Sequence, residues 1–283
     1  MTSSHTPLRS EQVHRGCSAA RRSGRGFSLV DLLVSLAVIA TLISILLPSL
    51  SKAQEAARRV GCASNMRQIG MALQMYAYEH GDRLPPSEFL DEDSRDYSPQ
   101  DTIFIYLSEN ATEDRVVVEY PNRWDGLGQL YAGEYLDAAQ AFYCPSHTGD
   151  HAFDHYKSLY DEHDGDIATN YQYRLPQNVR YFTDYRNSTT LLADAMRTQF
   201  DYNHQVGNYM FKADLSVTWF SDVDGRLLAS LPGDLVNPSD AVSAMETAWE
   251  LLDSKGSSDF DGPNHGGGGD GMPGGPIAGG GNG

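Results

Sequence analysis

The sequence has few cysteines, few basic residues and no recognisable catalytic motif. It contains three cysteines, and its 21 basic residues are outnumbered by 38 acidic ones, which gives a net charge of -17. Nucleic acid is therefore not expected as a partner, because so acidic a chain is repelled by phosphates. The sequence also lacks a Gly-x-Ser-x-Gly elbow, a phosphate-binding loop and a His-Glu-x-x-His pair. We therefore expect no enzyme.

The composition nevertheless predicts a folded body with a targeting segment at its start. Hydrophobic residues make up 40% of the 283 residues and include 16 tyrosines, enough for one sizeable domain with extensions. Residues 1–26 carry five arginines and one glutamate, so the rest of the chain is even more acidic than the whole. A basic start on an acidic chain is typical of a targeting segment.

A long apolar run follows the basic segment. Residues 27–47 contain a single charge, and as a helix they would measure about 31 Å, close to the apolar core of a bilayer. The preceding arginines predict a cytoplasmic N-terminus and a periplasmic body, with the chain crossing the inner membrane once. A conventional cleaved signal peptide fits poorly, because the run is too long and no small-x-small site follows it.

The junction of these two segments carries a family resemblance. Residues 25–34, RGFSLVDLLV, resemble the cleavage and methylation motif of type IV prepilins. The resemblance implies that prepilin peptidase cuts between Gly26 and Phe27 and that Phe27 is then N-methylated. It also implies that Pro48 kinks the helix and that Asp31 is the carboxylate that meets the N-terminal amine of a neighbouring subunit.

Asp31 departs from the family pattern, in which this position is usually glutamate. An acid within an apolar segment costs a few kcal/mol unless it is paired. The alternative to pairing is a carboxylate that reaches back to the cytoplasmic interface. Because aspartate is one methylene shorter, methylation or filament register could differ in this chain.

A helical pattern continues beyond the membrane segment, over residues 48–82. Gly81, Pro85 and Pro86 end the pattern. It predicts one helix from Phe27 to about His80, of which the first half lies in lipid and the second half packs on a head. This is the architecture of pilins, and residues 67–77 resemble a large group of pseudopilin-like proteins. Apolar residues recur every three or four positions: Leu50, Ala53, Ala57, Val60, Ala63, Met66, Ile69, Leu73 and Tyr76.

Residues 83–260 predict a globular head of the α+β class. Residues 124–131, 135–136, 142–146, 191–194 and 204–214 resemble the same pseudopilin-like group. In that group an Asp-Gly pair precedes the closing strand, and here Leu215 replaces the glycine. The predicted fold is a long N-terminal helix packed on a mostly antiparallel sheet. Strands are predicted at residues 101–107, 115–120, 189–193, 209–211 and 216–220.

Two C-terminal segments have different patterns. Residues 240–255 have apolar side chains at helical spacing and either pack on the head or dock a partner. Residues 261–283 are rich in glycine, which cannot build a core, so they are predicted to be a flexible tail.

The cysteines and histidines provide two candidate sites. Removal of the leader would remove Cys17 and leave Cys62 and Cys144, which either form a disulfide in an oxidising periplasm or stay as two unpaired buried residues. Three histidines are spaced by four and could share a helix face that binds a metal, although the nearby proline and glycine favour a solvated loop. They are His147, His151 and His155.

Two acidic loops are candidate sites for calcium as a cofactor. Asp222 and Asp224 form one cluster, and Asp161, Asp164 and Asp166 form the other. Calcium prefers such carboxylates, but neither cluster has the EF-hand spacing. Related major pseudopilins often hold calcium in a late loop. The alternative is turn chemistry, because Asp-Gly pairs favour tight turns.

The sequence thus predicts a structural subunit of a type II secretion-type pseudopilus. The partners expected from the resemblance are prepilin peptidase, other pseudopilins or pilins, the inner-membrane assembly platform and membrane lipid. Two alternatives are a minor pilin of a type IV pilus and a membrane-tethered periplasmic binding module that does not polymerise.

Overall fold

A computed structural model describes residues 28–90, 97–108, 122–175, 181–204, 206–234 and 237–254. The chain divides into two units, residues 1–53 and residues 54–283. The predicted cleavage site at Gly26 and Phe27, the predicted strand at 115–120 and the predicted tail lie outside the described residues.

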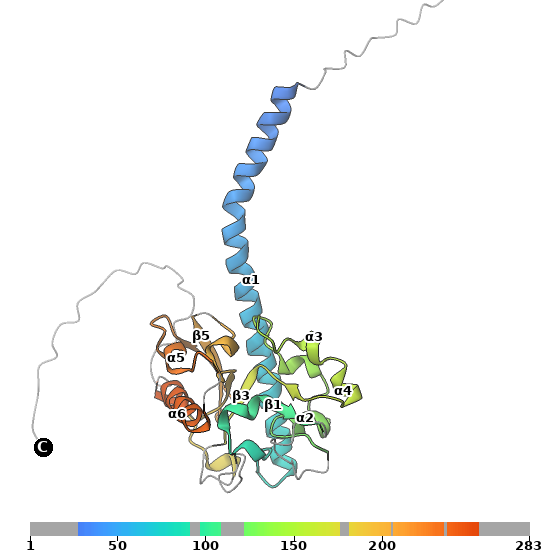
Figure 1. Cartoon of the computed structure of the whole chain (residues 1–283), viewed down its shortest axis with the longest axis vertical. Helices are drawn as coiled ribbons and strands as arrows, with labels where there is room; N and C mark the ends of the chain where they lie inside the picture. Colours follow the sequence, from blue (N-terminus) through green and yellow to red (C-terminus); the bar gives the residue numbers. More distant parts are fainter. Residues whose placement is uncertain are drawn as a thin grey trace, which may run out of the picture. The chain divides into compact units, whose positions relative to one another are not determined.

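Helix α1 runs from Leu29 to Glu79, as the sequence predicts, and includes Pro48 (Figure 1). Within residues 28–53 the apolar side chains are exposed, and Leu29 is 81% exposed. Polar hydroxyls in this stretch bond to the helix backbone: Ser35 donates to the carbonyl of Leu32 at 2.8 Å, and Thr41 donates to that of Val38 at 2.8 Å. Such internal pairing suits a helix in lipid. This segment is long and apolar enough to cross a membrane and fits a single-pass anchor.

The second half of α1 belongs to the head, but the head covers less of it than the apolar pattern predicts. The head buries the predicted apolar face from Cys62 onward, whereas Leu50 is exposed and Val60 is 68% exposed. Periodicity identifies which face of a helix is apolar but not where a covering layer begins. The buried residues of the helix are Cys62, Ala63, Met66, Ile69, Gly70, Ala72, Leu73, Tyr76 and Ala77.

Among its described residues, the head contains two antiparallel sheets, which confirms the α+β class. The larger sheet has four strands in the order β3-β4-β5-β6: Tyr171–Tyr173, Thr190–Asp194, Gly207–Lys212 and Val217–Ser221. The smaller sheet pairs β1, Phe104–Tyr106, with β2, Ile167–Ala168. The strands predicted at 101–107, 189–193, 209–211 and 216–220 correspond to β1, β4, β5 and β6.

Short helices connect these strands, and a longer helix follows them. The α-helices are α2 (Gly128–Ala132), α3 (Phe153–Tyr156), α4 (Leu159–Glu162), α5 (Arg226–Ser230) and α6 (Pro238–Ser254). The 3-10 helices are η1 (Glu88–Leu90), η2 (Pro99–Ile103), η3 (Ala139–Phe142), η4 (Phe182–Asp184) and η5 (Gln199–Asp201).

Hydrophobic layers cover both faces of the four-stranded sheet. Successive residues of a strand point to opposite faces, so Leu192 and Phe211 join the core formed with α1, whereas Ala193 and Met210 join the core formed with α5 and α6. Helix α6 therefore packs on the head (Figure 1). Packing on the head was one of the two roles predicted for residues 240–255.

The turn between β5 and β6 keeps its hairpin form although it lacks the glycine of the resembling group. Leu215 adopts a φ of +68°, a left-handed conformation that costs a residue with a side chain about 1–2 kcal/mol. Its amide donates to the carbonyl of Lys212 at 2.9 Å, and the amide of Ser216 donates to Asp214 Oδ1 at 3.0 Å. Local hydrogen bonds thus offset the cost of the substitution.

Helix α1 contacts the sheet through a position without a side chain. A Cβ atom placed on Gly70 would lie 2.2 Å from Cε2 of the buried Phe211 ring. We expect Gly70→Val to lower the free energy of unfolding by about 2–3 kcal/mol, because overpacking forces shifts in a close-packed core. Urea denaturation of the full-length protein in detergent measures this loss.

Two further variants test the cause of that loss. Shortening the facing ring by Phe211→Leu should make Gly70→Val less costly than it is alone, which a double-mutant cycle measures. The exposed Ser64→Ala is the control and should change stability by no more than about 0.5 kcal/mol. Unchanged stability of Gly70→Val would contradict the close approach of α1 to β5.

Candidate functional site

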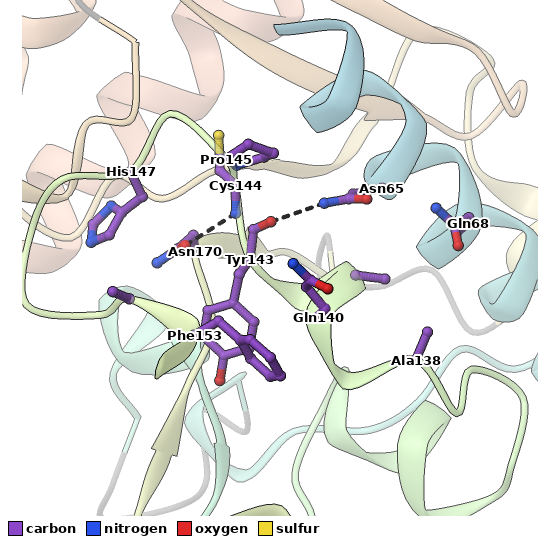
Figure 2. A pocket seen from close by; sticks show the side chains of 12 residues that line it. Asn65, Gln68, Ala138, Gln140, Tyr143, Cys144, Pro145, His147, Phe153 and Asn170 are labelled. Carbon is purple, nitrogen blue, oxygen red and sulfur yellow. Dashed lines mark hydrogen bonds between the residues drawn. The ribbon is translucent and has the colours of Figure 1, made fainter. Parts of the chain in front are cut away.

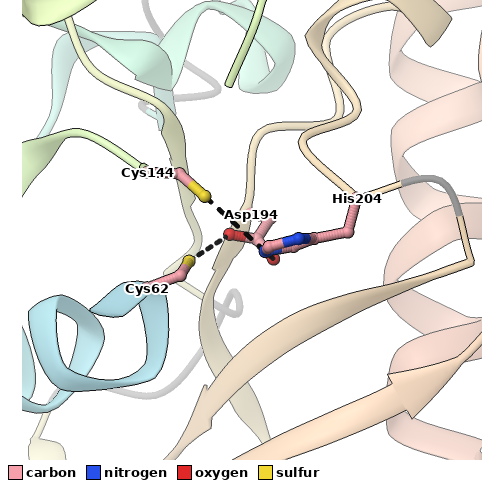
Figure 3. Close-up of side chains that lie close together, drawn as sticks. All are labelled: Cys62, Cys144, Asp194 and His204. Atoms are coloured by element: carbon pink, nitrogen blue, oxygen red, sulfur yellow. Dashed lines mark hydrogen bonds and ion pairs between the residues drawn. The ribbon is translucent and has the colours of Figure 1, made fainter. Parts of the chain in front are cut away.

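Four side chains from distant segments meet inside the head (Figure 3). Cys62 lies on α1, Cys144 follows η3, Asp194 ends β4 and His204 precedes β5. Their sulfur, carboxylate and ring nitrogen atoms all lie within 4.8 Å of one another. The exposed fractions of the four residues are 0%, 4%, 0% and 1% in that order. This Cys–Cys–Asp–His cluster is the candidate functional site.

Neighbouring amides hold the backbone that carries the cluster. The amide of Cys144 donates to Asn170 Oδ1 at 3.0 Å, and Asn65 Nδ2 of α1 donates to the carbonyl of Tyr143 at 2.9 Å. The amide of Asp194 donates to Asn208 Oδ1 at 3.1 Å. Each of these bonds joins different segments, so the positions of the four side chains depend on the packed head.

The four side chains of the cluster contact one another and neighbouring polar groups. Cys62 Sγ donates to Asp194 Oδ1 at 3.0 Å. His204 Nε2 lies 3.6 Å from Cys144 Sγ and 3.7 Å from Asp194 Oδ2. The Asp194 carboxylate also accepts the amide of Tyr209 at 2.6 Å and Asn203 Nδ2 at 3.3 Å.

The electrostatics of the cluster favour a positive charge on one of its four side chains. Burial raises the pKa of Asp194 and of the Cys62 thiol. Burial opposes ionisation of Cys144 as well, but hydrogen bonds from Cys62 and His204 lower the pKa of its thiol. For His204, burial lowers the pKa, yet Cys144 and Asp194 outweigh it and raise the pKa to about 9. A protonated imidazole thus supplies the positive charge here.

A second layer of charged groups orients the histidine. His204 Nδ1 donates to Glu55 Oε1 at 3.0 Å, so Nε2 faces the cluster. Glu55 also pairs with Arg58 at 3.1 Å and Arg59 at 3.3 Å and accepts the Ser146 hydroxyl at 3.1 Å. Burial raises the pKa of Glu55, but the bonds from His204, Arg58 and Ser146 lower it below its usual value, which keeps this carboxylate ionised.

The predicted disulfide partners are both in this cluster. Cys62 and Cys144 are free thiols in the structure, and both are buried. The sequence therefore identified two residues that lie side by side, and the bridge between them stays a prediction. Cys17 lies outside the described residues.

The three regularly spaced histidines bind different partners. Their Nδ1 atoms contact Asn203 Oδ1 at 2.7 Å for His147, the Tyr156 hydroxyl at 2.6 Å for His151 and the carbonyl of Asp150 at 2.7 Å for His155. Among the described residues, the group of histidine, cysteine and acidic side chains with metal-like spacing is the Cys–Cys–Asp–His cluster instead.

Three carboxylates of the predicted calcium loops, those of Asp222, Asp224 and Asp166, contact protein donors. Asp222 accepts the amides of Leu227 and Leu228, both at 2.9 Å, at the start of α5. Asp224 pairs with Arg226 at 2.8 Å. Asp166 accepts the amide of Ser108 at 2.9 Å. Asp161 and Asp164 are exposed. These contacts match the turn alternative, and calcium at either loop stays a prediction.

A cavity of about 410 Å³ lies beside the cluster, lined by residues that include Asn65, Gln140 and Phe153 (Figure 2). Cys144 contributes to its wall, but Figure 2 shows the sulfur directed away from Gln140 and Phe153. A cysteine nucleophile must be partly exposed to react. The buried Cys144–His204 pair therefore has the chemistry of a ligand set more than that of a nucleophile and its base.

Sequence reasoning identified the two cysteines of the cluster but not its other half. Asp194 lies 132 residues from Cys62, and His204 lies 60 residues from Cys144, so no local spacing connects them. The sequence signal that could have identified Asp194 and His204 is that both occur in segments that resemble the pseudopilin-like group.

Comparison with known proteins gives one family and one relative. A family model described as "Protein of unknown function (DUF1559)" matches residues 51–225, a range that includes the whole cluster. Competence protein ComGC of Halalkalibacterium halodurans is 35% identical over 60 residues, which cover 21% of this chain and 58% of the relative. The match thus spans less than two thirds of that relative. No solved structure matches.

Proposed function

The chain belongs to the DUF1559 family, and we propose that this member is a structural subunit of a type II secretion-type pseudopilus. The match with competence protein ComGC supports a pilin-like protein in general. A structural role also agrees with the burial of the Cys144 thiol, which is 4% exposed.

Helix α1 is the observation that carries this proposal. Its 51 residues combine an exposed apolar first part with a second part whose inner face is buried in the head. Exposed apolar surface of this extent marks contact with lipid or with another protein. A helix that is held in lipid before assembly, and among the helices of other subunits afterwards, meets both requirements.

The proposal divides the chain as follows. Residues 1–26 are a leader that prepilin peptidase removes, 27–47 cross the inner membrane, 48–82 continue the helix, 83–260 form a periplasmic head and 261–283 are a tail. Phe27 becomes the methylated N-terminus, on the cytoplasmic side. Asp31, in the first turn of α1, is the assembly carboxylate, and Pro48 is the site of a kink. The partners are pilin-like subunits and the assembly platform.

Mass spectrometry of the membrane-extracted protein tests the processing step. We expect a mature N-terminus at methylated Phe27, and we expect Gly26→Val to retain the leader because the peptidase then loses its glycine. An intact Met1 in the wild-type protein, or a cut after residue 47, would contradict the proposal.

Assembly is tested separately with variants of Asp31. Wild-type protein should appear in the filament fraction sheared from cells, and Asp31→Ala should stay in the membrane, because the amine of a neighbouring subunit loses its carboxylate partner. Asp31→Glu restores the usual family residue and is the matched control, expected in the sheared fraction. Assembly of Asp31→Ala at the wild-type level would remove this role.

The same experiment separates the alternatives. A membrane-tethered binding module would be processed but absent from sheared filaments. A minor pilin of a type IV pilus would be sheared together with pilus subunits, whereas a pseudopilus subunit would be sheared together with pseudopilins.

A further inference from the structure

We propose that Cys62, Cys144, Asp194 and His204 form a structural site for a divalent transition metal with the ligand preferences of zinc. This inference is independent of filament assembly, because it concerns only the interior of the head.

The donor set is the first argument. Two thiolates, one imidazole and one carboxylate are the ligands that zinc takes in proteins, whereas calcium and magnesium take oxygen almost exclusively. Four protein ligands complete a tetrahedron and leave no open position, which is typical of structural sites and not of catalytic ones. The burial of all four residues agrees with this type of site.

The distances are the second argument. With zinc–sulfur bonds of about 2.3 Å and zinc–nitrogen or zinc–oxygen bonds of about 2.0–2.1 Å, tetrahedral ligand atoms lie roughly 3.3–3.8 Å apart. In the cluster, the distance from Cys62 Sγ to Asp194 Oδ1 is 3.0 Å. The distances from His204 Nε2 are 3.6 Å to Cys144 Sγ and 3.7 Å to Asp194 Oδ2. All ligand atoms are within 4.8 Å, so shifts of about 1 Å or less would complete the tetrahedron.

The surroundings of the ligands supply an independent third argument. A histidine that binds a metal usually donates its other ring N–H to a carboxylate, a backbone carbonyl or a water, which fixes the ring and its tautomer. Glu55 has this position relative to His204, and Arg58 and Arg59 hold Glu55 in turn. The backbone amide of Tyr209 fixes the carboxylate of Asp194 in the same way.

Charge explains why an ion would be retained. A buried carboxylate beside two thiols is unfavourable unless a positive charge compensates it. Without an ion, His204 at 3.7 Å has this role, and a divalent ion would take it over. A divalent ion offsets two of the three negative charges of one carboxylate and two thiolates, and it leaves His204 as a neutral ligand. A disulfide between Cys62 and Cys144 would consume both thiolates, so the bridge and the metal site exclude each other.

The position of the ligands indicates what the site does. One ligand lies on α1, one at the end of β4 and two on connecting segments, so the ion would fasten the long helix to the sheet. Short elements make up most of this head, and a structural metal contributes its binding free energy to folding in such domains.

Metal analysis of the full-length protein in detergent tests the proposal. Inductively coupled plasma mass spectrometry should find about one zinc per chain, and Cys144→Ser or His204→Ala should reduce it at least tenfold, since each removes a ligand. His155→Ala removes an exposed histidine outside the cluster and is the control, which should keep its zinc. A strong chelator should lower the Tm of the wild-type protein, and added zinc should restore it.

A second measurement does not depend on whether the variants fold. Cobalt added to chelator-treated wild-type protein should produce the charge-transfer absorption of a cobalt–thiolate bond, with saturation at about one equivalent. Free thiols without this absorption would overturn the proposal. An intact mass that is two hydrogens lower, with a mapped Cys62–Cys144 bridge, would also overturn it, in favour of the disulfide.

Discussion

Replacing Trp249 with alanine is expected to lower the free energy of unfolding of the head by about 3–5 kcal/mol. Trp249 lies on α6 and is 4% exposed, in the core that covers the face of the sheet opposite α1. The guanidinium of Arg174 lies 5.3 Å from the centre of its ring, and Arg174 also pairs with Asp253 of α6 at 2.7 Å. The substitution therefore removes a large apolar side chain and one cation–π contact, and it leaves a cavity.

Urea denaturation of the full-length protein in detergent measures this effect. The matched control is Glu250→Ala, the exposed neighbour on the same helix, which should change stability by no more than about 0.5 kcal/mol. If Trp249→Ala cost as little as its control, α6 would not contribute to the core. The other predicted role of this segment, docking a partner, would then be favoured.

The second large effect is a pH dependence that originates at Asp125. This residue is fully buried. Burial raises the pKa of its carboxyl to about 7, although the Ser87 hydroxyl at 2.6 Å and the amide of Glu88 at 2.8 Å favour the ionised form. In the unfolded chain the same group would titrate near its usual pKa of about 3.9.

Whether Asp125 raises or lowers stability at a given pH depends on whether the folded or the unfolded chain keeps the proton of its carboxyl group. Below about pH 4 both states are protonated, so Asp125 makes no difference to stability. Between about pH 4 and pH 7 the unfolded chain loses the proton first, so stability falls as the pH rises. The penalty is complete above about pH 7 and amounts to about 4 kcal/mol at 1.36 kcal/mol per pKa unit.

Asp125→Asn should therefore stabilise the protein at neutral pH and have little effect near pH 4. Asparagine keeps the shape, can accept the amide of Glu88 and can donate to the Ser87 hydroxyl, but it never ionises. The measurement is the difference in the free energy of unfolding between variant and wild-type protein across this pH range. Other titrating groups cancel in that difference. A difference that does not vary with pH would show that Asp125 is ionised in the folded head.

Much of this fold was predictable because its principal element has a long and regular pattern. Helix α1 combines a continuous apolar run with a period of three to four residues and ends before Pro85 and Pro86. Strands β2 and β3 have two and three residues, too few for an alternating pattern to emerge. The start of the buried face at Cys62 depends on which elements cover the helix, and a single helix does not encode that information.

The cluster was predictable only in part, for a related reason. If the predicted leader is set aside, two cysteines are left, and an even number suggests a pair whatever their separation in the sequence. Asp194 and His204 have no such signal, because an aspartate at the end of a strand and a histidine in a loop are common. Only the packing of α1, β4 and the loop before β5 brings them together.

The burial of both thiols has a practical consequence for following the folding of this protein. Cys62 contacts Asp194, 132 positions away in the sequence, and His204 contacts Glu55, 149 positions away. Closing such long loops costs chain entropy before any contact compensates it. The thiols are therefore shielded only once the head has closed around them. The rate at which an alkylating reagent labels Cys62 and Cys144 consequently reports how much of the head has folded.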